Sequence, residues 1–166
     1  MRMAKNPPFR AIDPQVRIGH VHLKVADLKR SLKFYHDALG FEITTRYGAQ
    51  AVFLSAGGYH HQIGLNTWES LGGRPPAPGA TGLYHVAILY PTRTLLADAV
   101  RRVLAAGVEL EGAADHGVSE AIYLRDPDQN GVELYWDRPQ EQWPRKADGE
   151  IDMYTRQLDL EGLLKE

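Results

Sequence analysis

The residues of this chain that are best suited to chemistry are its histidines and one glutamate in apolar surroundings. The 166 residues include seven histidines and no cysteine, so a bound metal ion must be held by imidazole, carboxylate and water. Glu133 stands inside the apolar segment 131–137, where a carboxylate is costly unless a cation or hydrogen-bond donors meet its charge. His20 and His85 each stand near the start of an apolar segment. These three side chains are candidate ligands for one divalent metal ion.

The elements that position these residues follow the same order twice along the chain. The first copy opens with RIGHVHLKV (17–25), whose alternating apolar and polar residues predict a strand with one buried face. Asp27 is a suitable N-cap for a helix that ends at Gly40, where glycine favours a helix stop. Three glycine-separated strands follow in FEITTRY, AVFLSAG and YHHQIGLNTW. Residues 17–69 are therefore predicted to form a βαβββ module.

The second copy, 83–138, repeats this order. LYHVAILYP predicts a strand, TRTLLADAVRRVLAAG a helix, and the remainder three strands, the last two joined by the turn 126–131. The Gly- and Pro-rich segment 70–82 is typical of a linker, residues 1–16 form an N-terminal extension, and residues 139–166 form a tail that ends in a short amphipathic helix. We expect an α+β fold in which two tandem βαβββ modules with curved mixed sheets enclose a cavity.

Strand alternation predicts which side chains face that cavity. His20 and His22 share one face of the first strand, His85 takes the matching place in the second copy, and Glu133 shares a face with Tyr135. Two imidazoles and one carboxylate on one side of a metal ion, with the other positions open, are the ligand set of non-haem Fe(II) oxygenases. A histidine on a strand is also commonly a surface or hydrogen-bonded residue, so the pattern alone leaves a metal-free fold open. For His22 we favour a cavity-lining role without ligation.

Composition narrows the class of protein. A formal net charge of −2 is unlike the basic surplus that nucleic-acid binding requires. The sequence has no apolar run of membrane-spanning length, and its N-terminus lacks the apolar stretch of a secretory signal. A cytoplasmic globular protein with neither nucleic acid nor membrane as a partner is expected.

Three motifs resemble the vicinal oxygen chelate superfamily, which includes glyoxalases, bleomycin-binding proteins and extradiol dioxygenases: GHVHLKVADLKRSLKFYHDALGFE, YHVAI and YLRDPDQNGVELYW. The resemblance implies metal ligation by His20, His85 and Glu133, the same trio that alternation indicates. Glyoxalase I-type enzymes carry a fourth ligand, a glutamate, where this chain has Gly64. The resemblance therefore favours a three-ligand site with room for a bidentate substrate and O2.

Within the superfamily, the chain is most similar to small, two-module catechol 2,3-dioxygenase-like proteins. Tyr123 stands ten residues before Glu133, as the active-site tyrosine of extradiol enzymes does, and His61 aligns with their catalytic histidine. His116 lies where that branch often places a histidine behind the site. Strict alternation from Gly64 turns His61 away from the cavity unless the strand bulges, so His60 remains its rival as the acid-base group.

The resemblance implies an enzyme of aromatic catabolism that cleaves a catechol-like diol with O2. Fe(II) is the expected metal, Mn(II) the next candidate, and Ni(II) or Zn(II) are further alternatives. The rival functions are a glyoxalase-type isomerase or thiol transferase, with Gln62 or His60 as a fourth ligand, and a metal-free protein that binds a small aromatic molecule. Proteins of this superfamily commonly pair, so a homodimer is expected, and the sequence leaves open whether His20 and Glu133 come from one chain or two.

Overall fold

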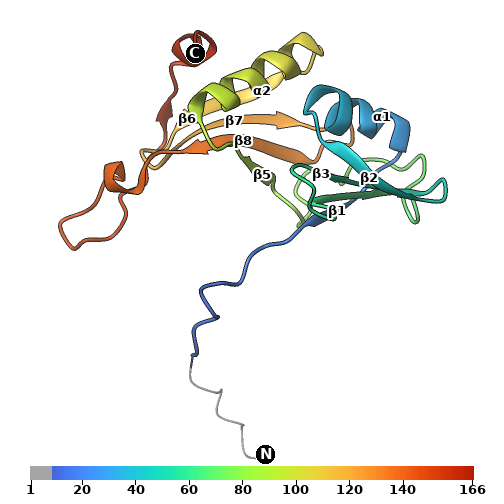
Figure 1. Cartoon of the computed structure of the whole chain (residues 1–166), viewed down its shortest axis with the longest axis horizontal. Coiled ribbons are helices and arrows are strands. Elements are labelled where there is room, and N and C mark those ends of the chain that lie inside the picture. Colours follow the sequence, from blue (N-terminus) through green and yellow to red (C-terminus); the bar gives the residue numbers. More distant parts are fainter. Residues whose placement is uncertain (1–8) are drawn as a thin grey trace, which may run out of the picture.

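The computed structural model describes residues 9–166, so the expected extension 1–16 is seen only from residue 9 onward. Two mixed sheets follow one another along the chain, and helices α1 and α2 cover the same side of the pair (Figure 1). Residues 9–17 run away from both sheets (Figure 1). None of the helices in the described part of the chain is long and apolar enough to cross a membrane.

The first module has the predicted βαβββ order. Its elements are β1 (Val21–Lys24), α1 (Leu28–Leu32), the π-helical turn η1 (Lys33–Ala38), β2 (Glu42–Tyr47), β3 (Ala51–Ser55) and β4 (Ile63–Asn66). The strand order is β1-β4-β3-β2, with β1 parallel to β4. The Asp27 carboxylate accepts a hydrogen bond from the Arg30 amide at 3.0 Å, so the predicted N-cap is confirmed. The predicted single helix instead widens to π geometry from Lys33, with the Leu39 amide bonded to the Phe34 carbonyl.

The second module repeats the order with longer strands. It consists of β5 (Val86–Leu89), α2 (Arg93–Ala105), β6 (Leu110–Asp115), β7 (Ser119–Arg125) and β8 (Gly131–Asp137). The tail contributes the 3-10 turn η2 (Gln140–Gln142), strand β9 (Arg156–Gln157) and the expected short helix α3 (Leu160–Leu164). The five-stranded order is β5-β8-β7-β6-β9, so the tail extends the second sheet, which the sequence pattern did not predict.

One apolar core runs through both modules. Phe34 and Tyr35 from η1 belong to the same buried cluster as Leu96 and Val100 from α2, and Leu163 of α3 is fully buried in it. Burial of such side chains is the main stabilising contribution to a fold of this size. The two modules therefore form one packed unit through their helical layer.

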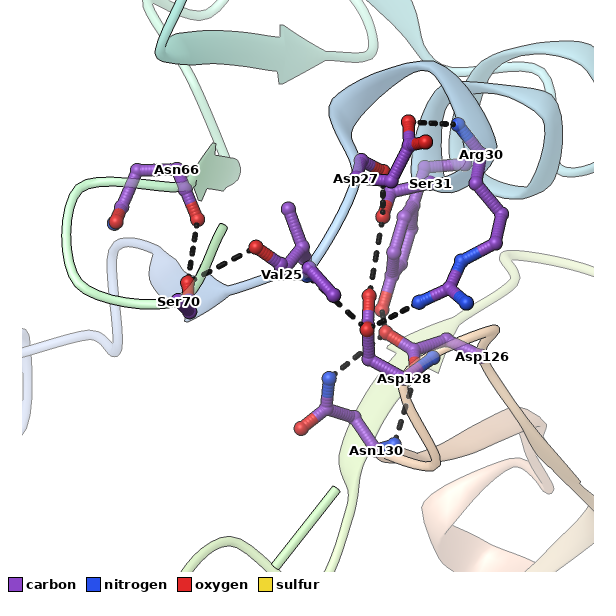
Figure 2. A network of polar contacts seen from close by, with 11 residues as sticks. Val25, Asp27, Arg30, Ser31, Asn66, Ser70, Asp126, Asp128 and Asn130 are labelled. Carbon is purple, nitrogen blue, oxygen red and sulfur yellow. Dashed lines mark hydrogen bonds and ion pairs between the residues drawn. The ribbon is translucent and has the colours of Figure 1, made fainter. Parts of the chain in front are cut away.

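The modules are also joined by two buried carboxylates in the β7–β8 turn (Figure 2). Asp126 is 1% exposed and accepts hydrogen bonds from the Tyr35 hydroxyl at 2.9 Å and from the amides of Asp128 and Asn130. Asp128 accepts from the Ala26 amide at 3.1 Å and pairs with Arg30. Burial, and then the charge of Asp126, raise the pKa of Tyr35, so its hydroxyl stays protonated as a donor.

Both sheets keep one edge unpaired on the side where the modules meet. Strand β1 pairs with β4 and β5 with β8, and over residues 9–166 no strand pairing joins the two sheets. Exposed apolar side chains flank these edges: Ile18 is 98% exposed, Tyr84 81% and Leu89 52%. A cleft of about 1080 Å³ lies between the modules, lined by residues of β1, β4, β5 and α2.

We predict that Asp126→Ala lowers the free energy of unfolding by about 3 kcal/mol, because it leaves a buried hydroxyl and two turn amides without their acceptor. Tyr35→Phe removes only one of these hydrogen bonds and should cost about 1 kcal/mol. Urea unfolding monitored by circular dichroism measures both values. Equal costs for the two variants would contradict a role for the whole Asp126 network in joining the modules.

Candidate metal centre

His85 and Glu133 lie together because β5 and β8 are parallel neighbours. Ala87 is paired with Glu133 in register, which brings the imidazole just before β5 alongside the carboxylate. His85 Nε2 lies 2.9 Å from Glu133 Oε2, and Glu133 is only 9% exposed. Adjacent ligands of an octahedral ion, each about 2.1 Å from it, lie about 3 Å apart. These two atoms therefore fit two neighbouring coordination positions of one divalent ion.

Glu133 also lies beside Tyr123, which in turn contacts His116. Tyr123 on β7 is the register partner of Glu133, and its hydroxyl lies 3.3 Å from Glu133 Oε1 and 2.7 Å from His116 Nε2. Burial, followed by the charge of Glu133, raises the pKa of Tyr123 to about 12. Tyr123 is therefore a neutral hydroxyl near pH 7, able to form hydrogen bonds but not to act as a general base.

The first module carries a separate histidine cluster. The ring centroids of His20 and His61 are 4.4 Å apart, and His61 also contacts Phe53 at 4.9 Å. His60 lies beside them, with its Nδ1 2.8 Å from the Nδ1 of His61. Burial, followed by the charges of neighbouring histidines, lowers the pKa of His61, which favours its neutral form near pH 7.

The position of His61 differs from strict strand alternation for a structural reason. Strand β4 begins only at Ile63, so residues 60–62 do not follow its alternation and His61 reaches His20 without a bulge inside the strand. Gln62, considered as a fourth metal ligand, has its side-chain oxygen engaged by the Ala56 amide at 2.8 Å and the Ser55 hydroxyl at 3.2 Å. That oxygen therefore links the two ends of the loop between β3 and β4.

One chain brings two of the three expected ligands together and leaves the third on the other module. Over residues 9–166, no group of three or more histidine or carboxylate side chains lies close enough to hold a metal ion. His20 lies with His61, at the exposed edge strand β1, whereas His85 and Glu133 lie at the edge strand β5 of the second sheet. The separation follows from the helical packing of the modules, which leaves these edges unpaired.

Gly64, the place of the fourth ligand in glyoxalase I-type enzymes, lies beneath the ring of His22. The two residues are register partners on β4 and β1, and a Cβ at Gly64 would lie 2.8 Å from His22 Cδ2. His22 also contacts Phe53 and Trp68, with ring centroids 5.6 and 5.4 Å away. His22 thus occupies the space next to position 64 and forms an aromatic cluster with Phe53 and Trp68.

Comparison with known proteins relates this geometry to a family. The sequence profile of the Glyoxalase/Bleomycin resistance protein/Dioxygenase superfamily matches residues 17–134. The chain is 41% identical over 156 residues to catechol-2,3-dioxygenase of Bacillus subtilis, covering 94% of this chain and 54% of that protein. It is 33% identical over 123 residues to biphenyl-2,3-diol 1,2-dioxygenase 3 of Rhodococcus globerulus, covering 73% of this chain and 63% of that protein.

The fold of this chain also matches the folds of solved structures. A glyoxalase/dioxygenase from Nostoc punctiforme superimposes with a TM-score of 0.64 at 19% identity, covering 80% of this chain and 100% of that one. This similarity concerns the fold, and it confirms the α+β arrangement expected from the sequence. The chain spans little more than half the length of the Bacillus relative, so that protein's activity does not transfer to it directly.

We predict that Gly64→Ala lowers the free energy of unfolding by about 1–3 kcal/mol, because the added methyl group forces the His22 ring to move. Removing that ring should relieve the strain, so the same substitution made in a His22→Ala background should cost clearly less. Urea unfolding of the two single variants and the double variant measures this coupling. If Gly64→Ala lowers the free energy of unfolding just as much in the His22→Ala background, the close contact between position 64 and the His22 ring is contradicted.

Proposed function

The chain belongs to the glyoxalase/bleomycin resistance protein/dioxygenase superfamily, and we propose that it is a non-haem Fe(II) extradiol dioxygenase that cleaves a catechol-like diol with O2. The observation that carries the proposal is the pairing of His85 with the buried carboxylate of Glu133, beside Tyr123 and His116. Relatives named as catechol and biphenyl-diol dioxygenases support the same reaction class.

Three residues of this set would hold the ion: His20, His85 and Glu133. Held by these residues, Fe(II) would supply Lewis acidity toward the diol and redox chemistry toward O2. The absence of a carboxylate at Gly64 supports an oxygenase, since a three-ligand site leaves positions for both oxygens of a diol and for O2. It disfavours a glyoxalase-type isomerase, as does the engagement of Gln62 within its own module.

The remaining residues would handle protons. His61, neutral near pH 7 because its pKa is lowered, would accept the proton of a diol hydroxyl and return it later. His60 is hydrogen-bonded to it and would pass or hold that proton. Tyr123, a neutral hydroxyl because its pKa is raised, would form a hydrogen bond with a substrate oxygen, and His116 would orient Tyr123. The aromatic face of His22, Phe53 and Trp68 offers a surface for the substrate ring.

The complete site is proposed to form between two copies of the chain, with His20 of one copy meeting His85 and Glu133 of the other. Three observations support this arrangement. The three donors are not gathered within residues 9–166 of one chain, strands β1 and β5 end their sheets unpaired, and exposed apolar side chains flank both edges. An unpaired edge with apolar neighbours is a typical surface for strand pairing with another chain.

We expect anaerobically purified protein to bind one Fe(II) per chain and to convert a catechol, with matching O2 uptake, to a yellow ring-opened product. Metal analysis, oxygen consumption and absorbance measure the three quantities. His85→Ala and Glu133→Ala should each lower metal affinity at least about tenfold, because each removes a ligand. Failure to bind stoichiometric Fe(II) or Mn(II) would exclude the proposal, and metal binding without cleavage of any diol would favour the isomerase.

Mixing two inactive variants tests whether the site is shared. His20→Ala and Glu133→Ala should each be inactive, but co-refolding equal amounts should restore about a quarter of wild-type activity, because random pairing makes half of the dimers mixed and each mixed dimer has one intact site of two. The matched control is a mixture of His85→Ala with Glu133→Ala, which should stay inactive because both ligands come from the same module. No recovery in the first mixture would place the site within one chain.

A further inference from the structure

The C-terminal segment packs directly beside His116. Strand β9 pairs with β6, with Asp115 opposite Arg156, and the Tyr154 amide donates to the His116 carbonyl at 3.3 Å. Downstream, α3 anchors the segment in the core through Leu163, which is fully buried. Residues 154–157 are thus fixed against the back of the His85–Glu133 site.

The ring of His116 lies between this segment and Tyr123. Its Nδ1 lies 2.9 Å from the Tyr154 carbonyl oxygen, and its Nε2 lies 2.7 Å from the Tyr123 hydroxyl. A carbonyl oxygen can only accept, so Nδ1 must carry a hydrogen, and the Thr155 hydroxyl at 3.3 Å can accept from it as well. In a neutral imidazole this leaves Nε2 as an acceptor. The single hydroxyl hydrogen of Tyr123 must then point to His116.

We propose that the C-terminal segment is a positioning element of the site: the Tyr154 carbonyl sets the tautomer of His116, which holds the Tyr123 hydrogen away from Glu133. A hydroxyl has one hydrogen, so Tyr123 cannot also donate to Glu133, whose Oε1 lies at the longer distance of 3.3 Å. The Glu133 carboxylate then keeps its lone pairs for a cation. The Tyr123 oxygen likewise keeps a lone pair that can accept a hydrogen bond from a substrate hydroxyl. This consequence for catalysis rests on the proposed function, whereas the tautomer itself does not.

The Tyr154 ring of this segment packs closely against Gly117, in the turn between β6 and β7. Gly117 has a φ of +78°, and a Cβ there would lie 2.6 Å from Tyr154 Cε1 and 2.8 Å from Pro144 Cγ. The Arg156 guanidinium lies over the Tyr154 ring, 4.1 Å from its centre, and makes a cation–π contact with it. A side chain at position 117 would therefore push Tyr154, and its carbonyl, away from His116.

Nitrogen-15 NMR of the histidine rings tests the proposal without metal or substrate. In the unmodified protein, above the pH at which His116 is protonated, we expect hydrogen on Nδ1 and none on Nε2. Gly117→Ala should convert His116 partly or wholly to the Nε2–H form. Gly149→Ala is the matched control, because Gly149, in the C-terminal tail, has a similar φ of +89° but open space around it, and it should leave the tautomer unchanged.

Activity gives the second readout. Gly117→Ala should lower kcat about tenfold with metal content unchanged, whereas Gly149→Ala should keep the wild-type kcat. If Gly117→Ala does not fold, Tyr154→Ala removes the seated ring without backbone strain and should shift the tautomer in the same direction. An Nε2–H tautomer in an active wild-type enzyme would overturn the positioning role, as would an unchanged tautomer in the folded variants. An Nδ1–H His116 in a protein that cleaves no diol would overturn the proposed function alone.

Discussion

The burial of two carboxylates in one turn governs how the rest of this structure is arranged. Asp126 and Asp128 lie almost out of contact with water, where an ionised carboxylate is tolerated only if donors surround it. Those donors include Tyr35, Arg30 and the Ala26 amide, all from the first module. The requirement for donors therefore fixes the second module against the helical side of the first.

This arrangement has a direct consequence for the proposed metal centre. With the modules joined through α1, η1, α2 and the β7–β8 turn, strands β1 and β5 remain at the edges of their sheets. His20 stands just before one edge strand and His85 just before the other, so these two proposed ligands lie where a second chain can reach them. The buried carboxylate of Glu133 is met by His85 and the neutral Tyr123 hydroxyl, and the proposed divalent cation would complete its charge compensation.

The tail also shapes the surroundings of the proposed site. By adding β9 to the second sheet, it places a backbone carbonyl against the only ring nitrogen of His116 that does not face Tyr123. A backbone carbonyl does not titrate and has no donor form, so it is a more constant partner than a side chain. Gly117 makes this approach available because it has no side chain to occupy the space of the Tyr154 ring.

The sequence by itself determined the repeated βαβββ order, the Asp27 cap and the short terminal helix, because these depend on local periodicity and capping. It also indicated that His85 and Glu133 share a site, since parallel strands of one module set their register. Only the tertiary structure decided that His20 lies apart from them, that His22 covers Gly64 and that Tyr154 contacts His116. These relations depend on how separate modules and the tail pack together, and strand alternation carries no information about packing between distant segments.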